Sequence, residues 1–249
     1  MTAPETLDGW FAIHDFRRLD RMAWNLLAAG ERHKALAEAT DLLTSFERQP
    51  VDPAGRSVTY SVIGHKADLL MIHLRPEVGQ LHELERAFDA TMLASYTTRP
   101  YSYLSVTEVS RHGASEGTVG NIEESPFVQA RLYPEIPAHS AYVCFYPMSK
   151  KRQTDNWYTL EASERAELMR AHGRTGRRYA GRVTQIVTGS MGLDDWEWGV
   201  TLFSDDPLEF KKLVYEMRFD EVSARFAEFG PFYVGRRLQP EDLLECLDD

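Results

Sequence analysis

The sequence predicts an α+β fold built from two ferredoxin-like units, arranged as in a dimeric α+β barrel and derived from an internal duplication. The patterns of each half give the order strand–helix–strand–strand–helix–strand, which is that of a split βαβ unit. The segments YSVIGHKADLLMIHL and QIVTGSMGLDDWEWGVTLF share one plan: a strand, a turn marked by glycine and a second strand. The glycines of the two segments, Gly64 and Gly189, lie 125 residues apart, which sets the repeat length.

Each predicted element rests on its own pattern. In the first half, an aromatic run and three apolar runs predict strands over 9–16, 58–64, 68–74 and 101–110. Amphipathic runs predict helices over 20–46, broken near Gly30, and over 77–95. In the second half, the corresponding strands are predicted over 140–146, 184–189, 197–203 and 232–237, and the helices over 161–172 and 207–227.

The boundary between the halves is predicted where apolar residues become rare. The segment HGASEGTVGNIEES is rich in small and polar residues, as connecting segments are. We therefore expect an N-terminal unit over 1–112, a linker over 113–125 and a C-terminal unit over 126–249.

Composition excludes several classes of protein. Among 249 residues, 43% are hydrophobic and 27% are charged, which is ordinary for a globular protein. No run of eighteen apolar residues or signal peptide is apparent, and two cysteines outside any Cys/His cluster favour a reducing, cytoplasmic location without a zinc site. The net charge of −10 argues against general nucleic-acid binding. Residues 148–182 nevertheless carry a charge of +5, as either a solvated basic face or a pocket for a small polyanion.

His172 is the first candidate for chemistry, because the sequence has no P-loop, GxGxxG, GxSxG or HExxH motif. Leu168 and Met169 precede it by one helical turn, so the imidazole is expected on an inward-facing stripe, with Gly173 as the helix C-cap. A core or capping histidine is the simpler interpretation. A single histidine ligand is also compatible with haem iron, to which the porphyrin supplies four nitrogens.

Tyr146 and Lys150 form the second candidate. The strand is expected to end at Pro147, so that the two side chains flank a turn. Tyr146 fits either an amphipathic lid or a redox-active phenol, and Lys150 suits binding a carboxylate or supplying a proton. Met148 could line an apolar pocket or fill the core.

Four further side chains could contact a ligand. Gln185 lies in an apolar strand and, if buried, needs a partner from the backbone or from a ligand opposite His172. Arg131 and Ser223 are able to bind carboxylates, although surface roles are the default. Trp157 could stack on a flat ring or belong to the core.

The motifs together resemble a known family. CFYPMSKKR, NWY, LMRAHGRTGRRYAGRV, QIVTGSMGLDDWEWGVTLF and DPLEFKKLVYEMRFDEVSARFAEFGPFYVGRRL are similar to the coproheme decarboxylase branch of the chlorite dismutase-like superfamily of haem-dependent peroxidases. The resemblance implies two ferredoxin-like units, an iron porphyrin in the second unit and a homopentamer. It implies conversion of iron coproporphyrin III to haem b, with hydrogen peroxide as oxidant and loss of two carboxyl groups as carbon dioxide. Coproporphyrin ferrochelatase is a further candidate partner.

The resemblance also implies residue roles. His172 corresponds to the iron ligand, Tyr146 to the tyrosine that becomes a radical, and Lys150 to its catalytic neighbour. The substrate-binding positions are Arg131, Tyr146, Pro147, Met148, Ser149, Lys150, Trp157, Gln185 and Ser223. Chlorite dismutases, which resemble this chain in fold, have an arginine at the position of Gln185. The actinobacterial decarboxylases use a histidine instead, so the sequence is similar to the Firmicutes type. A haem or coprohaem carrier or sensor, and a peroxidase-like or chlorite dismutase-like activity, are the alternatives.

Overall fold

The computed structural model describes residues 4–48, 55–110 and 122–248. The chain divides into two compact units. We call residues 9–106 with 233–249 the first unit, and residues 1–8 with 107–232 the second unit. Most of the predicted linker, 113–121, lies outside the described residues, and the predicted domain boundaries stay predictions.

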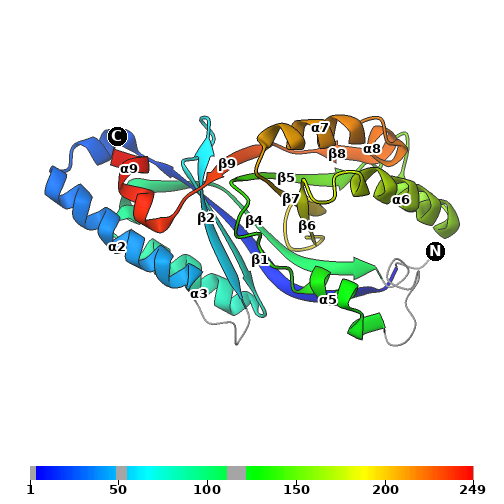
Figure 1. Cartoon of the computed structure of the whole chain (residues 1–249), viewed down its shortest axis with the longest axis horizontal. Helices are drawn as coiled ribbons and strands as arrows, with labels where there is room; N and C mark the ends of the chain where they lie inside the picture. Colours follow the sequence, from blue (N-terminus) through cyan, green and yellow to red (C-terminus); the bar gives the residue numbers. More distant parts are fainter. Residues whose placement is uncertain (1–3, 49–54, 111–121, 249) are drawn as a thin grey trace. The chain divides into compact units, whose positions relative to one another are not determined.

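The first unit is an antiparallel sheet covered by helices (Figure 1). Its strands are β1 (Thr6–Leu19), β2 (Arg56–Ile63), β3 (Leu69–Arg75), β4 (Thr97–Ser110) and β9 (Tyr233–Arg237), and they lie in the order β4-β1-β3-β2-β9. The helices are α1 (Arg21–Asn25), α2 (Ala29–Glu47), α3 (Val78–Asp89), η1 (Leu93–Tyr96), η4 (Pro240–Asp242) and α9 (Leu243–Asp248). The break predicted near Gly30 falls just before it, between α1 and α2.

The core of this unit lies between the sheet and the neighbouring helices α2 and α3. Leu69 and Met71 of β3 contribute to it from the sheet, together with Leu36 and Leu43 of α2. Because side chains alternate along a strand, the odd-numbered residues of β3 share this face. The helix amphipathicity read from the sequence therefore corresponds to a buried face.

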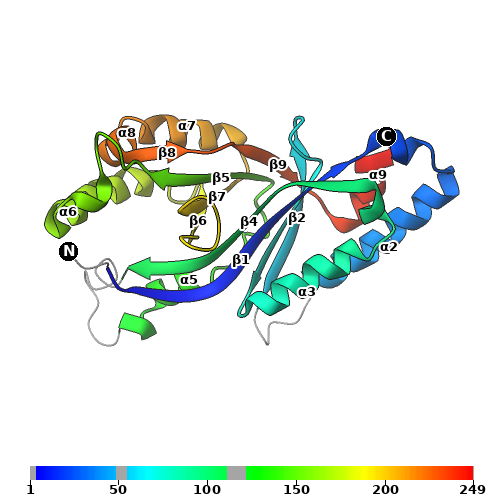
Figure 2. The same ribbon diagram turned by 180° about the vertical axis from the view of Figure 1, so that it is seen from behind.

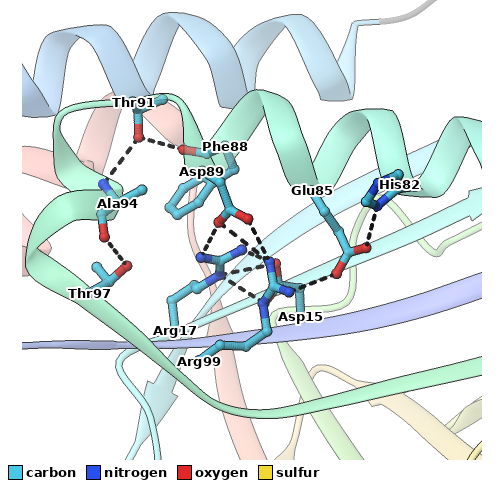
Figure 3. Close-up of polar contacts among 10 residues, drawn as sticks. All are labelled: Asp15, Arg17, His82, Glu85, Phe88, Asp89, Thr91, Ala94, Thr97 and Arg99. Carbon is cyan, nitrogen blue, oxygen red and sulfur yellow. Dashed lines mark hydrogen bonds and ion pairs between the residues drawn. The ribbon is translucent and has the colours of Figure 1, made fainter.

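A buried ion-pair network joins β1, β4 and α3 on the same side of the sheet (Figure 3). The guanidinium of Arg17 contacts Asp15 and Asp89, each at 2.6 Å. Arg99 contacts Asp15 at 3.2 Å, Glu85 at 3.1 Å and Asp89 at 3.2 Å. Five charged groups are thus satisfied by one another, as buried charges require.

The second unit repeats this arrangement. Its strands are β5 (Tyr142–Lys150), β6 (Thr184–Gly189), β7 (Trp198–Ser204) and β8 (Ala227–Phe229), in the order β8-β5-β7-β6. Its helices are η2 (Ile122–Glu124), α5 (Pro126–Leu132), η3 (Trp157–Thr159), α6 (Ala162–Arg177), α7 (Pro207–Met217) and α8 (Glu221–Phe226). Helix α7 packs on β5 and β7, and Figures 1 and 2 show α6, α7 and α8 gathered beside β5 and β8.

Both units have the strand order fourth–first–third–second when the strands of each are numbered along the chain. This is the order of a ferredoxin-like sheet, as the sequence predicts. An origin by duplication stays an interpretation of the shared order. None of the helices within the described ranges has the length and apolar character needed to cross a bilayer.

The last predicted strand pairs with a strand that the sequence did not predict as its partner. β9 pairs with β2 of the first unit, with Val62 opposite Gly235, whereas the fourth strand of the second unit is the short β8, paired with β5. The prediction of one helix over 207–227 was wrong because that helix ends at Met217. Asp220 then caps a separate helix, α8, by accepting a hydrogen bond from the Val222 N–H at 3.1 Å.

Candidate functional site

Strand β5 carries the predicted Tyr146–Lys150 segment, and it runs through Pro147 without a turn. The turn prediction was therefore wrong. The Pro147 carbonyl accepts a hydrogen bond from Gly230 N at 2.9 Å, just beyond the last residue of β8. In an antiparallel strand the N–H and C=O of one residue point to the same side, so the missing N–H of Pro147 faces the end of β8 and costs no hydrogen bond to β7 on the other side.

Strand register places Gln185, Tyr146 and Lys150 on one face of the sheet. Leu202 of β7 lies opposite both Gln185 of β6 and Cys144 of β5. Directly opposed residues of antiparallel strands share a face, and residues two apart on a strand do as well. Gln185 is exposed on this face, so its amide needs no buried partner.

Tyr146 is buried among aromatic rings. Its ring stacks on Phe232 at 4.4 Å between centroids and tilts against Phe229 at 5.8 Å. The guanidinium of Arg218 lies 3.8 Å from the centroid of Phe229. Burial raises the pKa of Tyr146 above its ordinary value, and Arg218 opposes that rise only partly. The phenol therefore keeps its proton at neutral pH and can be oxidised only with loss of that proton.

Lys150 is a buried lysine with an aromatic neighbour. Its Nζ lies 4.6 Å from the ring centroid of Trp157, a distance typical of a cation–π contact. Burial lowers the pKa of Lys150 to about 8, while the carboxylates of Asp220 and Glu197 oppose this effect. A lysine with this pKa can lose its proton near physiological pH, which is a property that a proton donor needs.

His172 lies within α6, which continues past Gly173 to Arg177, so Gly173 is not the C-cap. The inward stripe is narrower than predicted, because Leu168 is buried but Met169 is 45% exposed. His172 Nδ1 lies 2.7 Å from Asp220 Oδ1, and Asp220 is buried at the N-cap of α8. A carboxylate bound to Nδ1 fixes the tautomer and leaves Nε2 as the available ligand atom.

The sequence of residues 17–238 matches the model of a family described as chlorite dismutase. This chain belongs to the chlorite dismutase family. The resemblance found in the sequence is thereby confirmed. Among curated relatives, a protein of Thermus thermophilus named coproheme decarboxylase is 51% identical, and the match covers 96% of this chain and 94% of the relative.

Solved structures of the family have the same fold. A structure described as a novel heme-binding protein from Thermus thermophilus matches with a TM-score of 0.90 and 48% identity over 100% of both chains. Chlorite dismutase from Candidatus Nitrospira defluvii, in complex with imidazole, matches with a TM-score of 0.77 and 20% identity, covering 97% of this chain and 96% of the other. The predicted fold class of ferredoxin-like units is therefore confirmed.

The remaining candidate residues of this family member divide into two groups. Trp157 packs edge-on against Phe226 at 5.3 Å, and both belong to a small core with Leu168 and Val222. This core joins α6, which carries His172, to Val222 of α8. The next residue, Ser223, is also buried. Arg131 is exposed at the end of α5 and contacts the ring of Phe127 at 5.7 Å, not the other candidates.

A cleft of about 370 Å³ adjoins the site and is lined by Lys151, Gln153, Thr154, Asp155, Ala224 and Arg225. These residues follow Lys150 on the chain or follow Ser223 on α8. Met148 and Ser149 are half-buried, whereas Pro147 is buried.

Two residues of the site, Asp220 and Glu197, were not predicted from the sequence. Asp220 was detectable as a helix N-cap before EVSARF, but no local signal linked either carboxylate to His172 or Lys150.

Proposed function

We propose that this chain is a coproheme decarboxylase, which converts two propionates of iron coproporphyrin III to vinyl groups and so forms haem b. One observation carries the proposal. The His172–Asp220 pair lies on helices beside the sheet face that presents Tyr146, Lys150 and Gln185, and Asp220 acts electrostatically on Lys150. The curated Thermus thermophilus relative with the name coproheme decarboxylase supports the same assignment.

His172 would hold the iron of the substrate through Nε2. Asp220 would keep the imidazole in the required orientation and increase its basicity, as second-shell carboxylates do. Gln185 would face the opposite side of the porphyrin, and Arg131, Ser223 and the Met148–Lys150 backbone would contact its carboxylates. The excess of positive charge over 148–182 suits a substrate with four propionates.

Tyr146 would carry the oxidising equivalent to the propionate. Its phenoxyl radical would take a hydrogen atom from the β-carbon and regenerate the phenol. Loss of carbon dioxide and of one further electron leaves the vinyl group. For each propionate, one hydrogen peroxide and one proton are consumed, and one vinyl group, one carbon dioxide and two waters are formed. Catalysis by the protein is then chiefly positioning, because the substrate itself holds the redox-active metal.

Hydrogen peroxide is the oxidant in this proposal. The test is to mix the protein with iron coproporphyrin III, add hydrogen peroxide and follow the porphyrin by mass spectrometry. We expect two successive losses of a carboxyl group and the mass of haem b. An unchanged mass with retained binding would indicate a carrier or sensor, and turnover of a dye with intact propionates would indicate a peroxidase; either result would contradict the proposal. A homopentamer and substrate supply by coproporphyrin ferrochelatase are further parts of the proposal and rest on the resemblance. A cytoplasmic location is another part and rests on the low cysteine content.

The charge of Lys150 sets the expected pH dependence. A lysine with a pKa of about 8 loses its proton as pH rises through that value. If the ammonium binds or protonates the reacting carboxylate, kcat/KM falls with a midpoint near pH 8, far below the midpoint expected for an ordinary lysine. The measurement is the pH profile of kcat/KM for haem b formation, and Lys150→Met is the control that should lack this limb. A profile that stays flat to pH 10 would contradict the assignment.

Asp220→Asn is expected to weaken the hold on iron. An amide cannot supply the negative charge that orients and polarises His172, so affinity for iron coproporphyrin III should fall about 10- to 100-fold. Soret titration measures the change. The exposed Asp195 gives a matched control, Asp195→Asn, which should bind as the unmodified protein does. Equal affinity of all three proteins would exclude a role for Asp220.

A further inference from the structure

Glu197 is a buried carboxylate for which the proposed reaction has no role. It is 4% exposed and lies directly before β7. Its Oε2 accepts a hydrogen bond from the backbone N–H of Lys150 at 2.7 Å, and its Oε1 accepts one from the Arg152 guanidinium. Burial and this carboxylate both raise the pKa of the nearby Tyr158. A buried charge with such hydrogen-bond partners holds them in fixed positions.

The main chain of Glu197 is attached to the same strand end. Its N–H lies 3.1 Å from the Met148 carbonyl oxygen and 3.2 Å from Ser149 Oγ, both of which accept. Glu197 therefore contacts three consecutive residues of the predicted substrate-binding segment, from Met148 to Lys150. These contacts restrain the backbone of this strand end.

Glu197 also contacts the segment that carries Trp157, through Arg152. Arg152 and Tyr158 lie on either side of Trp157 in the sequence, and Arg152 also lies 5.6 Å from the centroid of the Tyr158 ring. Trp157 in turn lies beneath the Lys150 ammonium. The carboxylate thus ties the backbone of Lys150 and the aromatic ring that its Nζ contacts to one point.

We infer that Glu197 is a positioning residue that fixes Lys150 for decarboxylation, an inference that rests on the proposed function. The carboxylate does so by two routes: it anchors the backbone of Lys150, and it keeps Trp157 in place against the ammonium. It also contributes negative charge near Lys150. The charged groups around the lysine are Asp220, from the N-cap of α8, and Glu197, whose other oxygen is paired with Arg152.

Glu197→Gln is the informative change, because glutamine keeps the shape and one acceptor oxygen but loses the charge. We expect kcat for haem b formation to fall about tenfold, the alkaline limb to move about one pH unit lower, and binding of iron coproporphyrin III to stay within about twofold. Glu228→Gln is the matched control, since Glu228 is exposed and opposite Ser149 in the β5–β8 pair. It should leave all three quantities unchanged.

A double-mutant cycle with Lys150→Met separates positioning from a general structural role. If Glu197 acts through Lys150, Glu197→Gln lowers kcat in the native background but not in the Lys150→Met background. An equal loss in both backgrounds would overturn the inference. If Glu197→Gln does not fold, Arg152→Gln serves instead, because Arg152 is 65% exposed and releases the same carboxylate. Because loss of the Arg152 charge leaves Glu197 less compensated beside Lys150, the same limb should move by a smaller amount and to higher pH. An unshifted limb would count against the inference.

Nuclear magnetic resonance of protein labelled with 13C at lysine Cε keeps this inference distinct from the proposed function. The Lys150 signal, assigned by its loss in Lys150→Met, should titrate near pH 8 and move to lower pH in Glu197→Gln. If Lys150→Met retains full turnover, the proposed role of Lys150 in the reaction is wrong. The titration of the Lys150 signal would still decide whether Glu197 positions Lys150. An identical Lys150 signal in both proteins would overturn the positioning role.

Discussion

Replacement of Tyr146 by phenylalanine is expected to abolish formation of haem b while leaving binding of iron coproporphyrin III unchanged. Phenylalanine keeps the ring that stacks on Phe232, so the fold and the binding face persist. It lacks the O–H bond whose hydrogen is lost on oxidation, so hydrogen abstraction from the propionate has no route through residue 146. Turnover should fall by about three orders of magnitude or more.

Two measurements check this expectation. Mass spectrometry of the porphyrin after addition of hydrogen peroxide gives the product, and Soret titration gives the affinity. Tyr215→Phe is the matched control, because Tyr215 is 59% exposed on α7, and it should retain native turnover. Haem b formed by Tyr146→Phe at the native rate would remove Tyr146 from the reaction.

The second large effect concerns stability and lies in the first unit. Asp15→Ala removes the carboxylate shared by Arg17 and Arg99, and the side chains of Asp15 and Arg17 are 1% and 5% exposed. Removing one partner leaves a buried guanidinium only partly compensated, since Asp89 is itself half exposed. The free energy of unfolding should fall by about 3–5 kcal/mol. Urea unfolding followed by tryptophan fluorescence measures it.

The controls for this prediction use the same chemistry in other surroundings. Glu221→Ala breaks the exposed Arg225–Glu221 pair, which has i,i+4 spacing on α8, and should cost less than about 1 kcal/mol. The double replacement of Asp15 by leucine and Arg17 by methionine removes both charges and should restore most of the lost stability. A loss with Asp15→Ala no larger than that with Glu221→Ala would show that the network contributes little.

The sequence predicted the elements whose signal is local. The apolar runs of β2, β3, β6 and β7 and the apolar stripe of α3 form elements near their predicted bounds. The three-residue β8 was missed because it is too short to alternate. The pairing of β9 with β2 was not predicted, since strand periodicity carries no information about the pairing partner.

The candidate site shows the same limit. His172, Tyr146 and Lys150 were selected from motifs, and the structure adds the carboxylates that contact His172 and Lys150. Asp220 lies 48 residues from His172, and Glu197 lies 47 residues from Lys150. An acidic residue that far away has no spacing relation to its partner, so only the folded chain reveals the contact. The turn was wrongly predicted at Pro147 for a similar reason. Whether a strand can continue through a proline depends on the neighbouring strand that its missing N–H faces, and the sequence does not show that neighbour.

The return of the C-terminus has a consequence for any attempt to express the halves separately. Residues 233–248 supply the strand next to β2 and bury Leu238, Leu243 and Leu247 with residues of α2 and α3. A polypeptide that stops before residue 233 would leave an open hydrogen-bonding edge and an uncovered apolar surface, both of which promote aggregation. However the repeat originated, the first copy has come to depend on residues that are synthesised only after the second copy.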